Sequence, residues 1–168
     1  MLPKLLLFSM FTLSACSPQG LSGVKTFSAG KAGDHRTGLI AYANLGDPPA
    51  GGPHNAVWQN CGVYSKPLAP EYVAHSLEHG AVWVSYRRDL PASELEKLKK
   101  RLENRSKVLL SPYSQQAAVL STAWGVQKEY PGDSEDLSAF INRYQDRGAP
   151  EAGAPCTGGT DATDDRAS

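Results

Sequence analysis

The sequence predicts one small α+β domain, in which two or three helices pack on a mostly antiparallel sheet. Short runs of β-branched and aromatic residues, such as AVWVSY at residues 81–86, are typical of buried strands. A longer segment, residues 89–105, has apolar residues at helical spacing. Segments of the two types alternate without an internal repeat, and a chain of 168 residues has the length of a single domain.

The first elements are short. Residues 24–28 and 38–43 (GLIAYA) are expected to be strands, separated by a turn-rich loop that carries His35. The segment DPPAGGPH at residues 47–54 is rich in proline and glycine, which exclude regular structure. It therefore predicts a shaped loop that ends at His54.

Residues 70–79 (PEYVAHSLEH) are expected to form a short helix. Pro70 suits the first helical position, and Glu71 suits the positive end of the helix dipole. Gly80 is the residue type that commonly follows the end of a helix. The apolar run at 81–86 is then a strand that begins directly after this helix.

The pattern of residues 89–105 predicts the longest helix of the chain. Pro91 suits its start, and Ser93 with Glu96 can form a capping box. Leucines recur on one side of the segment, while glutamate and lysine alternate on the other, as on a solvated face. The apolar stripe therefore predicts the side that packs on the sheet.

Two apolar runs, residues 107–113 and 117–124, are expected to be strands paired as a hairpin. Asp133 is expected to cap a last helix, in which apolar residues again repeat at helical spacing. From Gly148 onward the chain is mostly glycine, alanine, aspartate and threonine, with little to bury. We expect disorder there, except near Cys156.

The N-terminal residues indicate an export signal. Lys4 precedes a short apolar run that cannot span a membrane. The run ends in Leu-Ser-Ala-Cys, and this small-residue cleavage site before Cys16 resembles the lipobox of bacterial lipoproteins. The resemblance implies cleavage before Cys16 and attachment of lipid to its sulfur, so that membrane lipid is a partner of the protein. An ordinary secreted protein, cut near Ala15, is the alternative.

The chain is therefore expected to have four parts: a lipoprotein signal peptide (residues 1–15), a lipidated cysteine with a tether (16–29), a globular domain (30–151) and a disordered tail (152–168). We expect the protein to be exported and anchored at the cell membrane or outer membrane. Basic and acidic residues number 17 each. This balance gives no broad basic surface for nucleic acid.

Cysteine usage agrees with export. If Cys16 carries lipid, Cys61 and Cys156 are left of the three cysteines. Outside the cytoplasm such a pair is most simply a disulfide, which would tie the C-terminal segment to the domain. A pair of free thiols or of thiolate metal ligands is the other interpretation.

The segment HSLEHG at residues 75–80 carries the most chemistry. His75 and His79 are four residues apart and share one face of a helix, with Glu78 beside them. The other two of the four histidines, His35 and His54, lie in loops that can fold over that face. We therefore predict that these four histidines bind a divalent transition metal, copper or zinc. Both methionines lie in the signal segment, which favours Cu(II) or Zn(II) over Cu(I).

Two further hypotheses remain open. The spacing of His75, Glu78 and His79 matches the inverted zinc-peptidase motif. It indicates a metal-dependent hydrolase in which Glu78 is the catalytic general base and Glu151 or Glu71 completes the site. The third hypothesis is a metal-free structural or partner-binding lipoprotein, whose histidines satisfy internal hydrogen bonds.

The motifs together resemble a bacterial family, the domain of unknown function 3105. Its pattern is a histidine after a first strand, then PPxSGPH, W…GVY, HSLEHG, AWG and a Pro-Glu near the end. The counterparts here, over residues 30–151, are His35, residues 48–54, Trp58 with residues 62–64, residues 75–80, residues 123–125, and Pro150 with Glu151. The resemblance implies an exported or membrane-anchored domain and places all four histidines inside family motifs. It implies no particular reaction.

Overall fold

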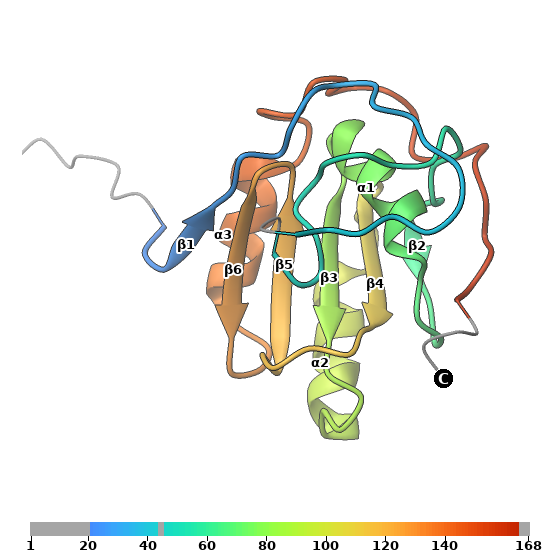
Figure 1. The fold of residues 1–168 in the computed structure, drawn as a ribbon. Helices are drawn as coiled ribbons and strands as arrows, with labels where there is room; N and C mark the ends of the chain where they lie inside the picture. The colour runs from blue at the N-terminus through green and yellow to red at the C-terminus, as the bar shows by residue number, and fades with distance from the viewer. Residues whose placement is uncertain (1–20, 44–45, 165–168) are drawn as a thin grey trace, which may run out of the picture.

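The computed structural model describes residues 21–43 and 46–164. Within them, six strands form one sheet and three helices pack on it (Figure 1). The strands are β1 (Val24–Thr26), β2 (Gly62–Val63), β3 (Val82–Tyr86), β4 (Val108–Pro112), β5 (Val119–Ala123) and β6 (Val126–Tyr130). The helices are α1 (Pro70–Glu78), α2 (Ala92–Leu102) and α3 (Glu135–Tyr144). No helix of the described residues is both long and apolar enough to span a bilayer.

The sheet is mixed, and its strand order is β1-β6-β5-β3-β4-β2. Strand β3 pairs antiparallel with β5 on one side and parallel with β4 on the other. The pairs β5–β6 and β1–β6 are antiparallel, and β2–β4 is parallel. The parallel step from β3 to β4 is made possible by α2, which carries the chain back to the same end of the sheet. The predicted single α+β domain is confirmed.

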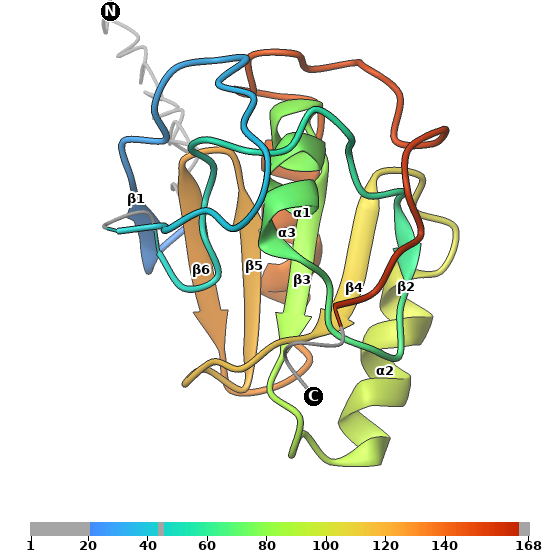
Figure 2. The ribbon, with the colours of Figure 1, turned by 45° about the vertical axis from the view of Figure 1, so that its right-hand side comes forward.

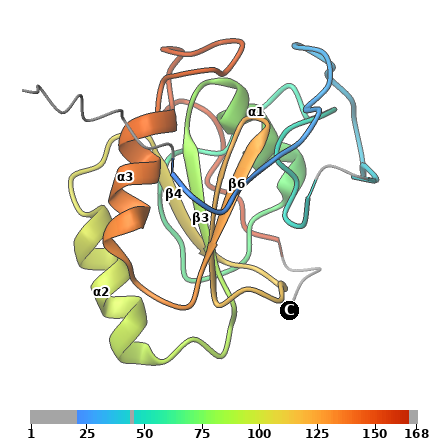
Figure 3. The same ribbon diagram turned by 90° about the vertical axis from the view of Figure 1, so that its left-hand side faces the viewer.

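Helices cover both faces of the sheet. Figure 3 shows α2 and α3 on one face, and α1 with the N-terminal loops on the other. Along β3 the side chains alternate between the two layers, because successive residues of a strand point to opposite faces. Val82 and Val84 belong to the core under α2 and α3, whereas Trp83 belongs to the core under α1. Every residue of β3 is buried, which explains why this part of the sequence is mostly apolar.

Helix α1 begins and ends as the sequence predicts. Pro70 occupies the start, Glu71 lies in the first turn, and His79 is the C-terminal cap. Gly80 follows with φ of +88°, and a Cβ atom at this position would lie 2.9 Å from the Cα atom of Asp146. Only glycine meets both conditions without strain. The chain therefore turns directly from His79 into β3, which fixes the end of the helix over the sheet.

The predicted hairpin of residues 107–113 and 117–124 is wrong. These runs are β4 and β5, but they lie on opposite sides of β3 and do not pair with each other. An apolar run shows that a strand is buried, not which strand it pairs with. The actual hairpin joins β5 to β6 through Trp124 and Gly125, and Gly125 has φ of +73°. Strand β6 was not predicted, because its sequence VQKEY is mostly polar.

Three local predictions also need correction. Residues 38–43 form no strand, and Leu39 is 77% exposed. Helix α2 has no side-chain cap, so the expected capping box does not form. Helix α3 is capped by Ser134 instead of Asp133, whose carboxylate receives hydrogen bonds from Arg101. In the last case the guanidinium is a stronger partner for a carboxylate than a helix amide is.

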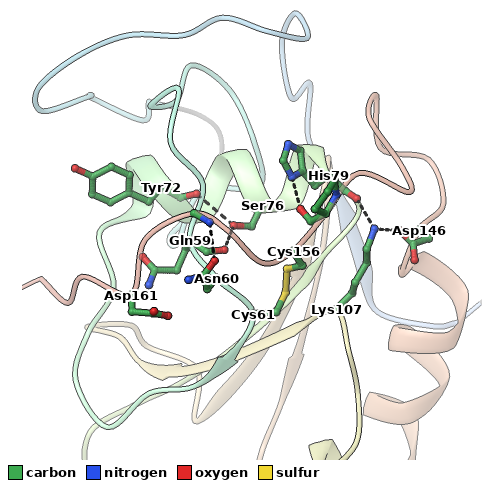
Figure 4. Close-up of a disulfide and its surroundings, with 12 residues drawn as sticks. Gln59, Asn60, Cys61, Tyr72, Ser76, His79, Lys107, Asp146, Cys156 and Asp161 are labelled. Carbon is green, nitrogen blue, oxygen red and sulfur yellow. Dashed lines mark hydrogen bonds and ion pairs between the residues drawn. A yellow bond between two sulfur atoms is a disulfide. The ribbon is translucent and has the colours of Figure 1, made fainter.

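The C-terminal segment is tied to the domain. Cys61 and Cys156 form the predicted disulfide, with a Cα–Cα distance of 5.4 Å (Figure 4). Beyond it, the backbone N–H of Asn60 donates to the carbonyl of Thr160, and Figure 2 shows this segment running beside β2. Residues 152–164, which belong to the expected tail, are thus held against the domain. The predicted signal peptide and lipidated Cys16 lie outside the described residues.

Candidate metal centre

The four histidines gather over α1, on the face of the sheet opposite α2 and α3. His75 lies on α1 and His79 at its C-terminal cap, and their ring centroids are 4.5 Å apart. The rings of His35 and His54 lie 5.0 and 4.8 Å from that of His75. The two loops thus fold over the helix, as the sequence predicts.

The two loops are joined to each other by their backbones. The N–H of His54 donates to the carbonyl of Asp34 at 3.0 Å, and the N–H of Arg36 donates to the carbonyl of His54 at 2.7 Å. This ladder brings the rings of His35 and His54 within 5.1 Å of each other. The proline- and glycine-rich loop is thereby locked to the first turn-rich loop, which fixes the approach of both rings to α1.

Three of the imidazole rings are oriented in the same way. Nδ1 of His54, His75 and His79 lies 2.7 to 2.8 Å from a backbone carbonyl in each case. A carbonyl oxygen only accepts hydrogen bonds, so Nδ1 carries a proton in each ring. In the neutral rings, Nε2 then holds a free lone pair. Histidines that bind metals show this arrangement, because the second hydrogen bond fixes the tautomer and the ring. The carbonyls belong to Gly52, Asn55 and Pro155, respectively.

Glu78 faces His54 in the interior of this cluster. Both side chains have 0% exposure, and Oε2 of Glu78 lies 2.9 Å from Nε2 of His54. The other oxygen, Oε1, accepts a hydrogen bond from the backbone N–H of Gly33 at 2.8 Å. Nε2 and Oε2 both lack a hydrogen-bond partner. Two such buried atoms repel each other unless a proton or a metal ion binds them.

His75 is neutral under physiological conditions. Burial lowers its pKa to about 4, although the hydrogen bond to the Asn55 carbonyl acts in the opposite direction. The neighbouring rings of His54, His79 and His35 lower it further. A neutral imidazole is the form that binds a metal, so protons do not compete for His75 at neutral pH.

The possible ligand atoms form two groups. In the inner group, ligand atoms of His35, His54, His75 and Glu78 all lie within 4.8 Å of one another. In the outer group, the same holds for His75, His79 and Glu151. His75 belongs to both groups. The structure thus brings all four predicted histidines together, but it divides them between two neighbouring positions.

Each group has one exposed member, which is His35 in the inner group and Glu151 in the outer group. The side chain of Glu151 is 49% exposed, and its Oε2 lies 3.4 Å from Nε2 of His79. The backbone places Glu151 there, because its N–H donates to the carbonyl of Glu78 at 2.9 Å. The sequence predicted a role for Glu151 only within the hydrolase hypothesis, and it also placed Glu151 in the Pro-Glu motif of the family. Its proximity to His79 depends on a long-range backbone contact, which no local pattern indicates.

Two tryptophans border the cluster without being ligands. The ring of Trp58 lies 4.9 Å from that of His79 and 5.7 Å from that of His75. The ring of Trp124 lies 6.1 Å from that of His54. Trp58 therefore borders the outer group and Trp124 the inner group. These apolar walls exclude water from one side of each position, which strengthens electrostatic interactions there.

Comparison with known proteins gives one result. No curated protein and no solved structure matches the chain. The model of one protein family, described as "Protein of unknown function (DUF3105)", matches residues 35–158. The match spans most of the chain and contains every residue of the inner and outer groups, from His35 to Glu151. The resemblance predicted from the motifs is confirmed, and the chain belongs to the family DUF3105.

Proposed function

We propose that the protein binds one divalent transition metal ion, Cu(II) or Zn(II), at the inner group, and that it does so as an exported lipoprotein. One observation carries the metal proposal. Nε2 of His54 and Oε2 of Glu78 face each other at 2.9 Å with no exposure and no hydrogen-bond partner. A metal ion bound to both atoms would satisfy the two of them at once.

The composition of the inner group favours copper or zinc over other cations. Three imidazole nitrogens and one carboxylate oxygen can approach a single point, and these are common ligands of Zn(II) and Cu(II). Magnesium and calcium prefer oxygen ligands throughout. Cu(I) prefers sulfur, and the only sulfur atoms of the described residues, those of Cys61 and Cys156, are joined in a disulfide.

Export and lipid anchoring rest on the sequence and on the disulfide. The cleavage pattern before Cys16 predicts a lipid anchor. The Cys61–Cys156 disulfide supports an oxidising compartment, because such bridges are rare in the cytoplasm. The metal site would then lie on a domain tethered to a membrane surface, where metal capture, delivery or sensing is the corresponding role.

The environment of Glu78 bears on the hydrolase hypothesis. A general base must reach a water molecule or a substrate. The Glu78 side chain has no exposed surface, and its two oxygens face Gly33 N–H and His54 Nε2. These contacts support a role for Glu78 as a metal ligand more than as a base, so we propose metal binding and not hydrolysis.

Metal content tests the proposal directly. The full protein, purified after export, is expected to hold about one equivalent of copper or zinc by mass spectrometry, with Glu78→Gln reducing the affinity by about 100-fold or more. Glu78→Gln keeps the shape of the side chain, so a folded variant is expected. Glu135→Gln, at a side chain that is 91% exposed and bonded to Arg101, is the matched control. Equal, near-zero metal in the wild type and Glu78→Gln would favour the metal-free hypothesis.

A further inference from the structure

We propose that the outer group is a second metal position, through which the ion enters before it moves to the inner group. This inference rests on the proposed metal binding and adds a route to it. The observation behind it is that His75 belongs to both groups. An ion can therefore pass from one set of ligands to the other without leaving the Nε2 atom of His75.

The shared histidine makes the two positions mutually exclusive. Nδ1 of His75 donates to the carbonyl of Asn55 at 2.8 Å, which leaves a single lone pair, on Nε2. One lone pair binds one ion. Two ions cannot both have a complete set of ligands, so the protein is expected to bind one equivalent in total.

The carboxylate ligand is exposed at the outer position and buried at the inner position. The carboxylate of Glu151 is 49% exposed, while His79 and His75 are each 4% exposed as residues. Glu78 and His54 have no exposure. A half-exposed carboxylate can meet a hydrated cation, and the buried rings can then replace its water molecules. The inner group offers one more nitrogen ligand than the outer group, which makes it the more stable end point.

The two positions are supported by different parts of the chain. The inner group depends on the N-terminal loops, through the carbonyl of Gly52 and the N–H of Gly33. The outer group depends on the C-terminal segment, because the carbonyl of Pro155 orients His79 and the next residue, Cys156, is tied by the disulfide. A change in one support can therefore alter one position and leave the other intact.

A second entry route has to be distinguished. His35 is also exposed and belongs to the inner group, so an ion could enter there without contacting Glu151. In addition, the contact between Glu151 and His79 could be an ion pair with no role in metal binding. In either case, removal of the Glu151 charge would leave the rate of metal entry unchanged.

The test is a stopped-flow measurement of Cu(II) entry into the full metal-free protein, followed by quenching of tryptophan fluorescence. Trp58 and Trp124 lie close enough to the two groups to act as reporters. Glu151→Gln is expected to slow association by about tenfold or more, because an exposed carboxylate attracts the cation. Release should slow by a similar factor, which leaves the equilibrium affinity nearly unchanged. Glu135→Gln, which removes an exposed carboxylate bonded to Arg101, should load at the wild-type rate.

A second variant isolates the outer position. His54→Gln removes an inner ligand, and Cu(II) is then expected to remain at the outer group with lower affinity and fewer nitrogen ligands by electron paramagnetic resonance. Addition of Glu151→Gln to this variant should abolish the remaining binding.

The outcomes separate the two proposals. Wild-type protein that binds no metal would overturn the proposed function, and this inference with it. Wild-type protein that binds one ion, with Glu151→Gln loading at the normal rate, would overturn only the entry route. Two ions bound per protein would contradict the mutual exclusion.

Discussion

Removal of the disulfide has an effect on stability that can be worked out from the structure. Cys61 and Cys156 are 95 positions apart in the sequence. A bridge that closes a loop of this length restricts the unfolded chain by roughly 4 to 5 kcal/mol in the loop-entropy model, and native disulfides typically contribute about 2 to 5 kcal/mol. We expect the double variant Cys61→Ala/Cys156→Ala to lose stability within this range.

The folded state of this variant should keep most of its contacts. The N–H of Cys61 donates to the carbonyl of Cys156 at 2.8 Å, and the N–H of Asn60 donates to that of Thr160 at 2.9 Å. Neither hydrogen bond involves sulfur, so the C-terminal segment can keep its register. Without the disulfide, however, the C-terminal segment is held to the domain less strongly. This segment contains Pro155, whose carbonyl orients His79. Metal entry should therefore slow, while the affinity of the inner group stays close to that of the wild type.

Urea unfolding followed by tryptophan fluorescence, in the presence of a chelator, measures the stability change. The oxidised wild type and the double variant are compared at equal pH, and the dependence of the free energy on urea is fitted for each. A difference below about 1 kcal/mol would refute the reasoning, because a closed loop of this length cannot contribute so little in the entropy model. Unaltered metal entry, together with the expected loss of stability, would show that the bridge does not support the outer group.

Three further outcomes are expected. Gly80→Ala should destabilise the protein by about 2 kcal/mol or more, as measured by thermal unfolding. The new side chain would combine a positive φ with a Cβ atom 2.9 Å from the Cα atom of Asp146. Gly148→Ala, at a position with positive φ and no atom within 4 Å, should lower the stability clearly less. The hydrogen bonds from Arg101 lower the pKa of Asp133 in the folded protein. The ionised carboxylate therefore stabilises the fold at pH values above about 3.9, the pKa of an aspartate in the unfolded chain. This contribution is lost as the pH falls through the lower pKa of the folded state. Asp133→Asn should therefore flatten the fall in stability between about pH 5 and pH 2, and an unchanged profile would exclude this pair as its cause. Trp58→Phe should remove most of the early fluorescence quenching by Cu(II), and an undiminished early phase would indicate that the ion does not first bind beside Trp58.

Local patterns predicted the elements that hold the site, since each depends on neighbouring residues. Pro70, Glu71 and Gly80 determine where α1 begins and ends, so the placement of His75 and His79 on one face followed from the sequence. The apolar runs of β3, β4 and β5 were recognised because both faces of each strand are buried. The burial of a strand can be predicted from the residue types of that segment alone.

Pairing and long-range contacts could not be predicted in the same way. Strand β3 lies between β4 and β5, and this arrangement depends on the packing of α2. An apolar run in the sequence is compatible with pairing on either side of a strand. The mostly polar β6 has no such run and is defined by its pairing with β5. At the site, the residue types were visible but their supports were not. Carbonyls of Gly52, Asn55 and Pro155 orient the rings, and a backbone carbonyl has no signature in the sequence.

The division of the histidines into two groups also lay beyond the sequence. The sequence predicted one cluster of four rings, whereas the structure places His79 with Glu151 and the loop histidines with Glu78. The side chain of Glu78 points toward the loops because it is anchored by the N–H of Gly33, which is distant in the chain.

The central claim is tested most directly by anomalous X-ray diffraction from crystals of the protein grown with Zn(II). We expect one strong peak about 2.1 Å from Nε2 of His54 and His75 and from a carboxylate oxygen of Glu78. Zinc found only at surface carboxylates, with the 2.9 Å contact between His54 and Glu78 unchanged, would contradict the proposed metal site.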